Sequence, residues 1–414
     1  MGFIILFLIL GCSNANSDSI RIAVISDIHF LSHSLVDGGA AANAFEMSTG
    51  RNTDDLHNVL DKVLGNLLEK NIDVLLISGD LSNHGEKQSH LDLIEKLRIL
   101  QENNVEVFVI PGNHDVNIPD SKAYIGDKAI SVESISSKEF TELYESFGYG
   151  NAIMRDDSTL SYLAEIDENT WLLAIDTNKF DEYTTSSITS GRIKPETLEW
   201  ALKVLELAKL KNITVLGIMH HGLVEHMPYQ NAFFPNYLIE NWQDVSDKLA
   251  DAGLKVVFTG HFHSNDVTLR TTVKGNTIYD VQTASLSQYP FAYRVMELSD
   301  SELFIDSYFI SSIPSNINLE TEYRQKLESI TYRVAYNRIK NLGITMPEKM
   351  VEALTNVIVR LNLAHVRGDE KPDPEMMMSI RVFAALLGNE IEIEDYSFDF
   401  PPADNKLVIE LERD

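Results

Sequence analysis

Five short clusters of Asp, Asn and His hold the side chains with which this sequence could do chemistry. They are Asp27-Ile28-His29, Gly79-Asp80, Gly112-Asn113-His114-Asp115, His220-His221 and Gly260-His261-Phe262-His263. Carboxylate and amide oxygens combined with imidazole nitrogens bind Mn, Fe or Zn. Two such ions about 3.5 to 4 Å apart can clamp a phosphoryl group during its displacement. The residue types therefore predict a site for two divalent or trivalent metal ions, Mn, Fe or Zn, that acts on phosphoesters.

Each cluster comes directly after a short apolar run, which is typical of a strand covered on both faces. Strands of this kind are expected at residues 20–26, 73–78, 105–110, 171–175, 213–219 and 255–259. Helical periodicity lies between them at 56–69, 90–103 and 195–209. This alternation predicts an α/β fold. Because such sheets place their ligand sites at the carboxyl ends of parallel strands, we expect the five clusters to converge.

The pattern along the chain predicts three parts. Residues 1–19 read as a lipoprotein signal and polar linker, 20–312 as the catalytic domain, and 313–414 as a small, mainly helical C-terminal domain. Within the second part, further strands are expected at 277–282, 292–298 and 303–309, and a long excursion at 116–161 is expected to shape the substrate entrance. Within the third, helices are expected at 319–364, with a break at Gly343, and at 376–387.

The charge balance and the cysteine count exclude two classes of protein. The chain has 34 Lys and Arg against 62 Asp and Glu, a formal net charge of −28, which disfavours binding along a nucleic-acid duplex. Cys12 is the only cysteine, so one chain can form neither a disulfide framework nor a thiolate zinc cluster. We therefore expect a small phosphoester as the partner; the sequence predicts no oligomeric state.

The five clusters, in this order and spacing, resemble the calcineurin-like metallophosphoesterase superfamily over roughly residues 20–309. The resemblance implies a four-layer α/β/β/α sandwich with a dinuclear site at the sheet edge. It also implies two sets of ligands that share Asp80 as a bridge: Asp27, His29, Asp80 and His263 for the first metal, and Asp80, Asn113, His220 and His261 for the second.

The same resemblance implies the mechanism. A hydroxide that bridges the metals attacks phosphorus, and Asn113 and His114 lie against the phosphate. His114 holds the phosphate or protonates the departing oxygen. Asp115 stands behind His114 and orients it.

Other polar residues in the clusters leave alternatives open. His84 either contacts the leaving group or is a solvated loop residue. His221 replaces His220 as ligand if the preceding strand runs one residue longer. Asp176 lies near the entrance or caps a turn. The remaining histidines, read most simply as surface residues, are His33, His57, His90, His226 and His365.

Departures from the family patterns indicate a subfamily. Asn83 stands where purple acid phosphatases have tyrosine, and Asp115 where protein phosphatases have glutamate. The compact motifs are similar to bacterial class III cyclic-nucleotide phosphodiesterases, and closer still to secreted or lipid-anchored enzymes of Gram-positive bacteria. Hydrolysis of phosphodiesters such as cyclic nucleotides is the function expected. A phosphomonoesterase or nucleotidase, and a surface-tethered binding protein with a vestigial site, are the alternatives; the complete ligand set argues against the latter.

The single cysteine follows an apolar segment at residues 3–10. That segment is shorter than the roughly 20 residues that cross a bilayer, but it suits a signal peptide. Ile9-Leu10-Gly11-Cys12 resembles a bacterial lipobox and implies an extracytoplasmic, membrane-anchored lipoprotein lipidated on Cys12. The alternatives are a myristoylation signal, although Leu6 stands where Ser or Thr is needed, and a hydrophobic N-terminal segment with a chance cysteine.

The lipobox hypothesis predicts that Cys12→Ser releases the protein from membranes while leaving its catalytic activity unchanged. Fractionation of the native host, with mass spectrometry of the mature N-terminus, measures both effects. A mature protein that begins at unprocessed Met1 would refute the lipoprotein hypothesis.

Overall fold

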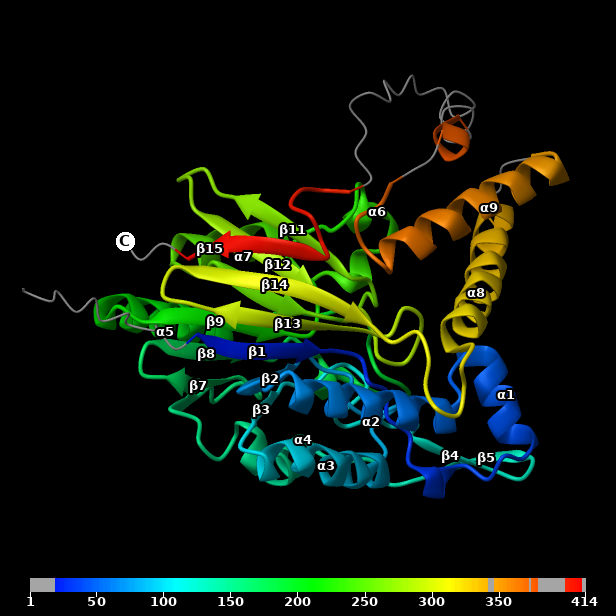
Figure 1. Ribbon diagram of the computed structural model, residues 1–414, viewed down its shortest axis with the longest axis horizontal. Coiled ribbons are helices and arrows are strands. Elements are labelled where there is room, and N and C mark those ends of the chain that lie inside the picture. Colours follow the sequence, from blue (N-terminus) through cyan, green and yellow to red (C-terminus); the bar gives the residue numbers. More distant parts are fainter. Residues whose placement is uncertain (1–18, 342–345, 372–373, 379–398, 412–414) are drawn as a thin grey trace, which may run out of the picture.

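The computed structural model describes residues 19–341, 346–371, 374–378 and 399–411, and within them two β-sheets pack face to face with helices on both outer faces (Figure 1). The strand order is β15-β14-β13-β1-β2-β3 in the first sheet and β11-β12-β10-β9-β8-β7-β6 in the second. This arrangement confirms the four-layer α/β/β/α sandwich.

The strands of the first sheet are β1 (Ile20–Ile25), β2 (Val74–Ile77), β3 (Glu106–Val109), β13 (Ala292–Leu298), β14 (Glu302–Phe309) and β15 (Lys406–Glu410). Those of the second are β6 (Met154–Arg155), β7 (Tyr162–Asp167), β8 (Thr170–Ile175), β9 (Thr214–Met219), β10 (Val256–Thr259), β11 (Asp266–Thr271) and β12 (Thr277–Gln282). A separate hairpin joins β4 (Lys122–Ile125) to β5 (Lys128–Ser131). Every predicted strand is present, and the sequence patterns missed β4 to β7, β11 and β15.

The helices are α1 (Ala40–Thr49), α2 (Thr53–Glu69), α3 (Lys87–Glu102), α4 (Ser137–Leu143), α5 (Pro195–Lys211), α6 (Gln230–Phe233), α7 (Trp242–Asp251), α8 (Leu319–Asn341) and α9 (Glu348–His365). Helix α2 begins where the Asn52 side chain accepts the backbone N–H of Asp55, an N-cap. Helix α5 begins with Pro195, whose missing N–H costs nothing in the first turn.

The apolar runs of the strands are explained by cores on both faces of each sheet. In β8, Leu172 and Ala174 face the core shared by the two sheets. Trp171 and Leu173 point the other way, into a core beneath α5 and α7. Side chains alternate along a strand, so a strand covered on both faces must be apolar at every position. This burial holds the strand ends, and the clusters that follow them, in place.

The C-terminal region shares the core of the first sheet. It is helical in α8 and α9, as predicted, but β15 then returns and pairs antiparallel with β14, with Ile409 opposite Leu303 (Figure 1). Leu319 of α8 is buried in the same core as β1. The helix predicted at 376–387 falls largely outside the described residues. Its first residues belong to the described segment 374–378, which is helical. In the described parts of the chain, no helix combines the length and apolar character that crossing a membrane requires.

The position of β15 makes a testable prediction. Ile409 is fully buried and Val408, its neighbour on the same strand, is 53% exposed. Ile409→Ala should lower the free energy of unfolding by about 2 to 4 kcal/mol, because it leaves a cavity. The control Val408→Ala should change it by less than about 1 kcal/mol. Urea denaturation measures both, and equal effects would show that β15 does not belong to the cooperative core.

Candidate metal centre

The clusters meet where the carboxyl ends of strands from both sheets face each other. Asp27 and His29 follow β1, Asp80 follows β2, Asn113 follows β3, His220 follows β9, and His261 and His263 follow β10. Five of these seven residues have a positive φ, between +46° and +69°: Asp27, His29, Asp80, His261 and His263. Residues with a Cβ avoid this conformation, and its concentration here is typical of a functional site.

The backbone holds these strained turns against each other. The N–H of Asp27 donates to the carbonyl of Gly79 at 3.1 Å, and that of His29 to the carbonyl of Asp80 at 2.9 Å. A Cβ on Gly112 would lie 2.2 Å from the backbone nitrogen of Asp80. Glycine is therefore required for the turn after β3 to approach the turn after β2.

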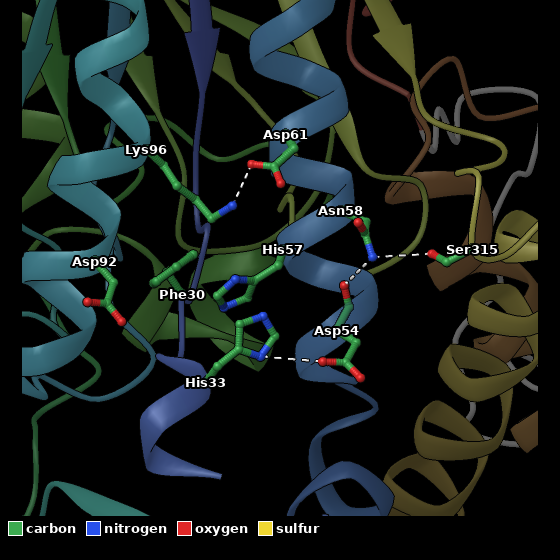
Figure 2. Close-up of a pocket in the computed structure, with 9 residues that line it drawn as sticks. All are labelled: Phe30, His33, Asp54, His57, Asn58, Asp61, Asp92, Lys96 and Ser315. Carbon is green, nitrogen blue, oxygen red and sulfur yellow. Dashed lines mark hydrogen bonds and ion pairs between the residues drawn. The ribbon is translucent and has the colours of Figure 1, made fainter. Parts of the chain in front are cut away.

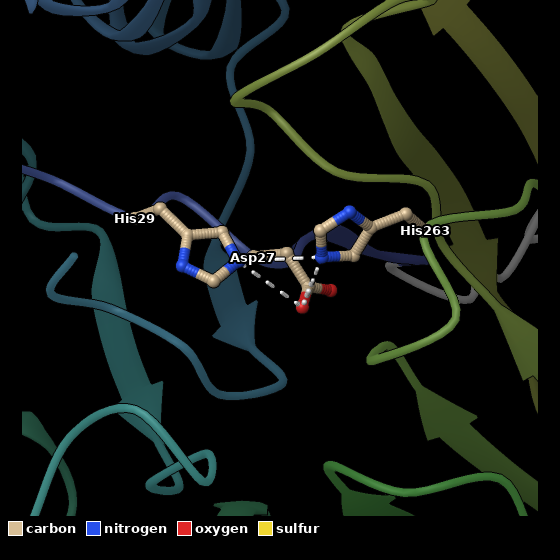
Figure 3. Close-up of side chains that lie close together, drawn as sticks. All are labelled: Asp27, His29 and His263. Carbon is tan, nitrogen blue, oxygen red and sulfur yellow. Dashed lines mark hydrogen bonds and ion pairs between the residues drawn. The ribbon is translucent and has the colours of Figure 1, made fainter. Parts of the chain in front are cut away.

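The first group of donor atoms consists of Asp27, His29 and His263, whose side chains point at one another in Figure 3. Nε2 of His263 lies 3.3 Å from Nε2 of His29 and 3.2 Å from Oδ1 of Asp27. Oδ1 of Asp27 is buried and has no hydrogen-bond partner, although Oδ2 accepts the N–H of His261 at 3.0 Å. The unpartnered oxygen therefore faces two imidazoles in a space that suits a cation.

The second group consists of Asp80, His220 and His261. Nε2 of His220 lies 3.4 Å from Oδ2 of Asp80, 3.1 Å from Nδ1 of His261 and 3.1 Å from Oδ1 of Asn113. Oδ2 of Asp80 also lies 3.6 Å from Nε2 of His29. Asp80 therefore stands between the two groups.

These distances fit two metal ions. Ligands about 2.1 Å from one ion lie about 3.0 to 3.4 Å apart in octahedral or tetrahedral geometry, which is close to the 3.1 to 3.6 Å separations observed in both groups. Hydrogen bonds from the ring nitrogens that face away from the centre also fix the orientation of two imidazoles. Nδ1 of His220 bonds to the carbonyl of Ser78 at 2.8 Å and Nε2 of His261 to that of Asn236 at 3.2 Å, as is usual for imidazoles that bind metals.

The electrostatics of the site favour ionised carboxylates. Burial alone would raise the pKa of Asp80, but the imidazoles of His220 and His114 outweigh it and hold that pKa well below its usual value. Burial lowers the pKa of His220, but Asp80 and Asp27 outweigh burial and raise it to about 9. The carboxylates thus create a negative potential that draws positive charge into the site.

His114 lies at the end of a chain of hydrogen bonds that the sequence did not indicate. Its Nδ1 is 2.8 Å from Nδ1 of His84, whose Nε2 is 2.9 Å from Oδ1 of Asp120. Nε2 of His114 has no partner among the described residues, and the ring is 5.1 Å from that of His29. Both ring nitrogens of His84 are therefore occupied, and its side chain contacts His114.

The prediction that Asp115 orients His114 is wrong. Its two oxygens accept the backbone N–H groups of Gly112, Leu81 and Ser82 and the hydroxyl of Ser82, at 2.8 to 3.1 Å. A carboxylate has about four acceptor positions, so these bonds use its capacity. Asp115 fastens the turn after β3 to the turn after β2 and does not reach the reacting groups.

The other open alternatives are settled by hydrogen bonds. Both ring nitrogens of His221 are occupied, by Oγ1 of Thr177 at 2.7 Å and by the carbonyl of Thr189 at 3.0 Å, so His220 is the residue that faces the cluster. Asp176 caps a turn, accepting the N–H of Asn178 at 3.0 Å. Neither His221 nor Asp176 contributes to the two donor groups.

Four of the five remaining histidines are not surface residues. His33 is exposed as predicted, whereas His57, His90, His226 and His365 are at most 8% exposed. Each finds internal partners; His90, for example, bonds to the Tyr144 hydroxyl and to the carbonyl of Asp115. An imidazole with a paired ring nitrogen can be buried, and the sequence alone does not show those partners.

Two features of the site carry no local sequence signal. Arg51, between α1 and α2, is close enough for Asp80 and Asp27 to raise the pKa of its guanidinium, although burial outweighs them and lowers it to about 10. An aromatic wall lies beside the second group: Tyr237 contacts His261 with ring centroids 5.0 Å apart and Phe262 at 4.6 Å, and Phe234 adjoins Phe262 at 5.6 Å. Only the fold brings Arg51, Phe234 and Tyr237 to the cluster.

A cavity of about 540 Å³ lies between α2 and α3, separate from the donor groups (Figure 2). Its polar side chains are paired locally: Lys96 with Asp61 at 2.5 Å and His33 with Asp54 at 3.4 Å. None of the seven clustered donors lines it. It therefore does not contain the candidate metal centre.

The chain is similar to known proteins in sequence and in fold. Residues 20–265 match the family described as Calcineurin-like phosphoesterase. A protein of Coxiella burnetii named "Probable cyclic nucleotide phosphodiesterase" is 25% identical over 254 residues, which cover 60% of this chain and 78% of that protein. A protein of the same name from Vesicomyosocius okutanii is 41% identical over 68 residues, 16% of this chain and 27% of that protein. A dimetal phosphatase from Danio rerio shares the fold, with a TM-score of 0.51 at 14% identity over 70% of this chain and 96% of that one.

Proposed function

As a member of the calcineurin-like phosphoesterase family, this chain is a metallophosphoesterase, and we propose that it hydrolyses small phosphodiesters such as cyclic nucleotides. The observation that carries the proposal is the pair of donor groups on either side of Asp80, whose Oδ2 lies 3.6 Å from His29 and 3.4 Å from His220. A carboxylate in that position can serve two ions at once.

The proposed ligands are those that the sequence predicted. Asp27, His29, Asp80 and His263 would hold the first ion, and Asp80, Asn113, His220 and His261 would hold the second. Two bound ions would supply Lewis acidity at the phosphoryl oxygens and a water deprotonated at neutral pH. The imidazole-carboxylate donor set suits Mn, Fe and Zn.

His114 is the proposed proton donor to the leaving oxygen, and His84 is its positioning residue. The carboxylate of Asp120 accepts the Nε2–H of His84. When His84 also carries a proton on Nδ1, this N–H donates a hydrogen bond to Nδ1 of His114. The proton of the neutral His114 ring is then on Nε2, the nitrogen that would face the substrate. After this proton passes to the leaving oxygen, the proton on His84 moves to Nδ1 of His114 and the pair is neutral.

A diester is favoured over a monoester because the site offers a surface for a second organic arm. The aromatic wall of Phe234, Tyr237 and Phe262 adjoins His261, and a nucleobase stacks well on such rings. Arg51 supplies a cation for the phosphate. The names of the relatives from Coxiella burnetii and Vesicomyosocius okutanii support the same substrate class.

We also propose that this enzyme lies outside the cytoplasm, as a bacterial lipoprotein anchored through Cys12. The lipobox-like segment supports that location; Cys12 itself lies outside the described residues.

A substrate panel tests the proposed function. With Mn²⁺, Fe²⁺ or Zn²⁺, kcat/KM should be higher for bis(nitrophenyl) phosphate and for cyclic nucleotides than for nitrophenyl phosphate and nucleoside monophosphates. Asp80→Asn is the control, because loss of the shared carboxylate should abolish metal-dependent turnover of every substrate. Higher kcat/KM for the monoesters would instead identify a phosphomonoesterase.

The hydrogen bond between His84 and His114 predicts a dependence on the leaving group. His84→Gln should slow hydrolysis of ribose or alkyl esters by about 10²-fold, because these leaving oxygens need a proton. Nitrophenyl esters, whose leaving group departs as an anion, should slow by less than about threefold. The exposed His33→Gln serves as the control for loss of a histidine. An equal loss for both ester types would show that His84 only supports the structure.

A further inference from the structure

A second set of buried ionisable side chains lies where the C-terminal region meets β11. Asp266 begins β11, His365 ends α9, and Glu370 is in the loop that follows. Nδ1 of His365 lies 2.5 Å from Oε1 of Glu370 and 3.3 Å from Oδ2 of Asp266. The three side chains are 10%, 3% and 1% exposed in the order His365, Glu370 and Asp266. None of them belongs to the centre around Asp80.

The three side chains have more acceptors than donors. The N–H on Nδ1 of His365 can point at only one oxygen, and it bonds to Glu370. Oδ2 of Asp266 and Oε2 of Glu370 are buried and receive no hydrogen bond. A buried carboxylate oxygen without a partner is destabilising. Two buried carboxylate oxygens therefore face the point between the three side chains without a hydrogen-bond donor.

Neighbouring cations do not fill this gap. Arg294 is fully buried close by, but its guanidinium donates to the carbonyls of Gln282 and Asp404 at 2.7 and 2.5 Å and to the hydroxyl of Ser307 at 2.9 Å. Burial lowers the pKa of His365, but Asp266 and Glu370 outweigh it and raise that pKa to about 10. Asp266 and Glu370 therefore favour positive charge at the His365 ring.

His226 and Asp280 fix the orientation of the Asp266 side chain. Nδ1 of His226 lies 2.6 Å from Oδ1 of Asp266, and Nε2 of His226 lies 3.3 Å from Oδ2 of Asp280. All three side chains are at most 1% exposed. This arrangement occupies one oxygen of Asp266 and leaves Oδ2 directed at His365. Ligating carboxylates in metal sites are held by hydrogen bonds of this kind.

We propose that Asp266, His365 and Glu370 bind a third metal ion, a divalent Zn²⁺ or Mn²⁺, which joins the C-terminal region to β11. One imidazole and two carboxylates form a donor set that both ions accept. Ligands of a tetrahedral ion about 2.0 Å away lie about 3.3 Å apart, which equals the distance between Nδ1 of His365 and Oδ2 of Asp266. The 2.5 Å between Nδ1 of His365 and Oε1 of Glu370 is a hydrogen-bond distance, and it must lengthen when an ion binds. The ion replaces the proton on Nδ1 of His365.

The third ion would support the neighbouring active-site loop without taking part in catalysis. Phe262 lies between His261 and His263 in the sequence, and its ring contacts that of His365 with centroids 5.4 Å apart. Fixing His365 therefore restrains Phe262, which belongs to the loop that carries His261 and His263. This inference is independent of the substrate class proposed above.

Metal content measured by mass spectrometry tests the proposal. After loading with Mn²⁺ or Zn²⁺ and removal of free metal, the full-length wild type should hold three ions per chain. Asp80→Asn should lose the dinuclear centre and keep one ion, and Glu370→Gln should keep two. The matched control is Glu320→Gln, which removes a C-terminal carboxylate paired with Arg367 and should keep three.

Two further measurements separate this site from the dinuclear centre and from misfolding. Added Mn²⁺ or Zn²⁺ should raise the Tm of Asp80→Asn but not that of Asp80→Asn combined with Glu370→Gln. Anomalous diffraction from wild-type crystals soaked in Mn²⁺ should give a peak between Asp266, His365 and Glu370. Two ions in the wild type with none in Asp80→Asn, or no anomalous peak among these side chains, would overturn the third site and leave the dinuclear centre intact.

Discussion

The structure depends on two buried carboxylates, Asp27 and Asp80, that must be neutralised in the seam between two apolar sheets. Neither is more than 1% exposed, and an isolated charge there would cost several kcal/mol. Imidazoles from both sheets surround them at 3.2 to 3.9 Å. Positive charge at this point therefore joins the first sheet, which provides the carboxylates, to the second, which provides His220, His261 and His263.

The backbone around the carboxylates explains why these motifs contain glycine. A Cβ on Gly260 would lie 1.9 Å from Oγ of Ser26 and 2.6 Å from Oδ2 of Asp27. The turn after β10 can therefore approach the turn after β1 only without a side chain. The positive φ values at Asp27 and Asp80 persist because packed strands on both sides determine the loop path. Apolar burial in the strands thus offsets strain in the turns.

The C-terminal region is part of the same cooperative structure. Helix α8 packs Leu319 into the core of the first sheet, and β15 completes that sheet. His365, at the end of α9, contacts Phe262 within the loop that holds two of the proposed ligands. The region that the sequence separates from the catalytic domain therefore supports the active site through packing.

The amino-acid sequence alone determined nine of the strands and the convergence of the five clusters, and its resemblance to a known family implied the four-layer fold and the seven donors. Buried strands must be apolar, and the residues after them lie at one sheet edge; both rules are local and can be applied to Asp27, Asp80 or His220 without coordinates. Only the tertiary structure decided the partners of Asp115, which binds backbone N–H groups, and of His84, which bonds to His114. It also decided the burial of His226 and His365 and the return of β15 to the first sheet. These depend on contacts between segments distant in the chain, such as Glu302 opposite Glu410 in β14 and β15, and such contacts leave no periodic pattern in the residues on either side.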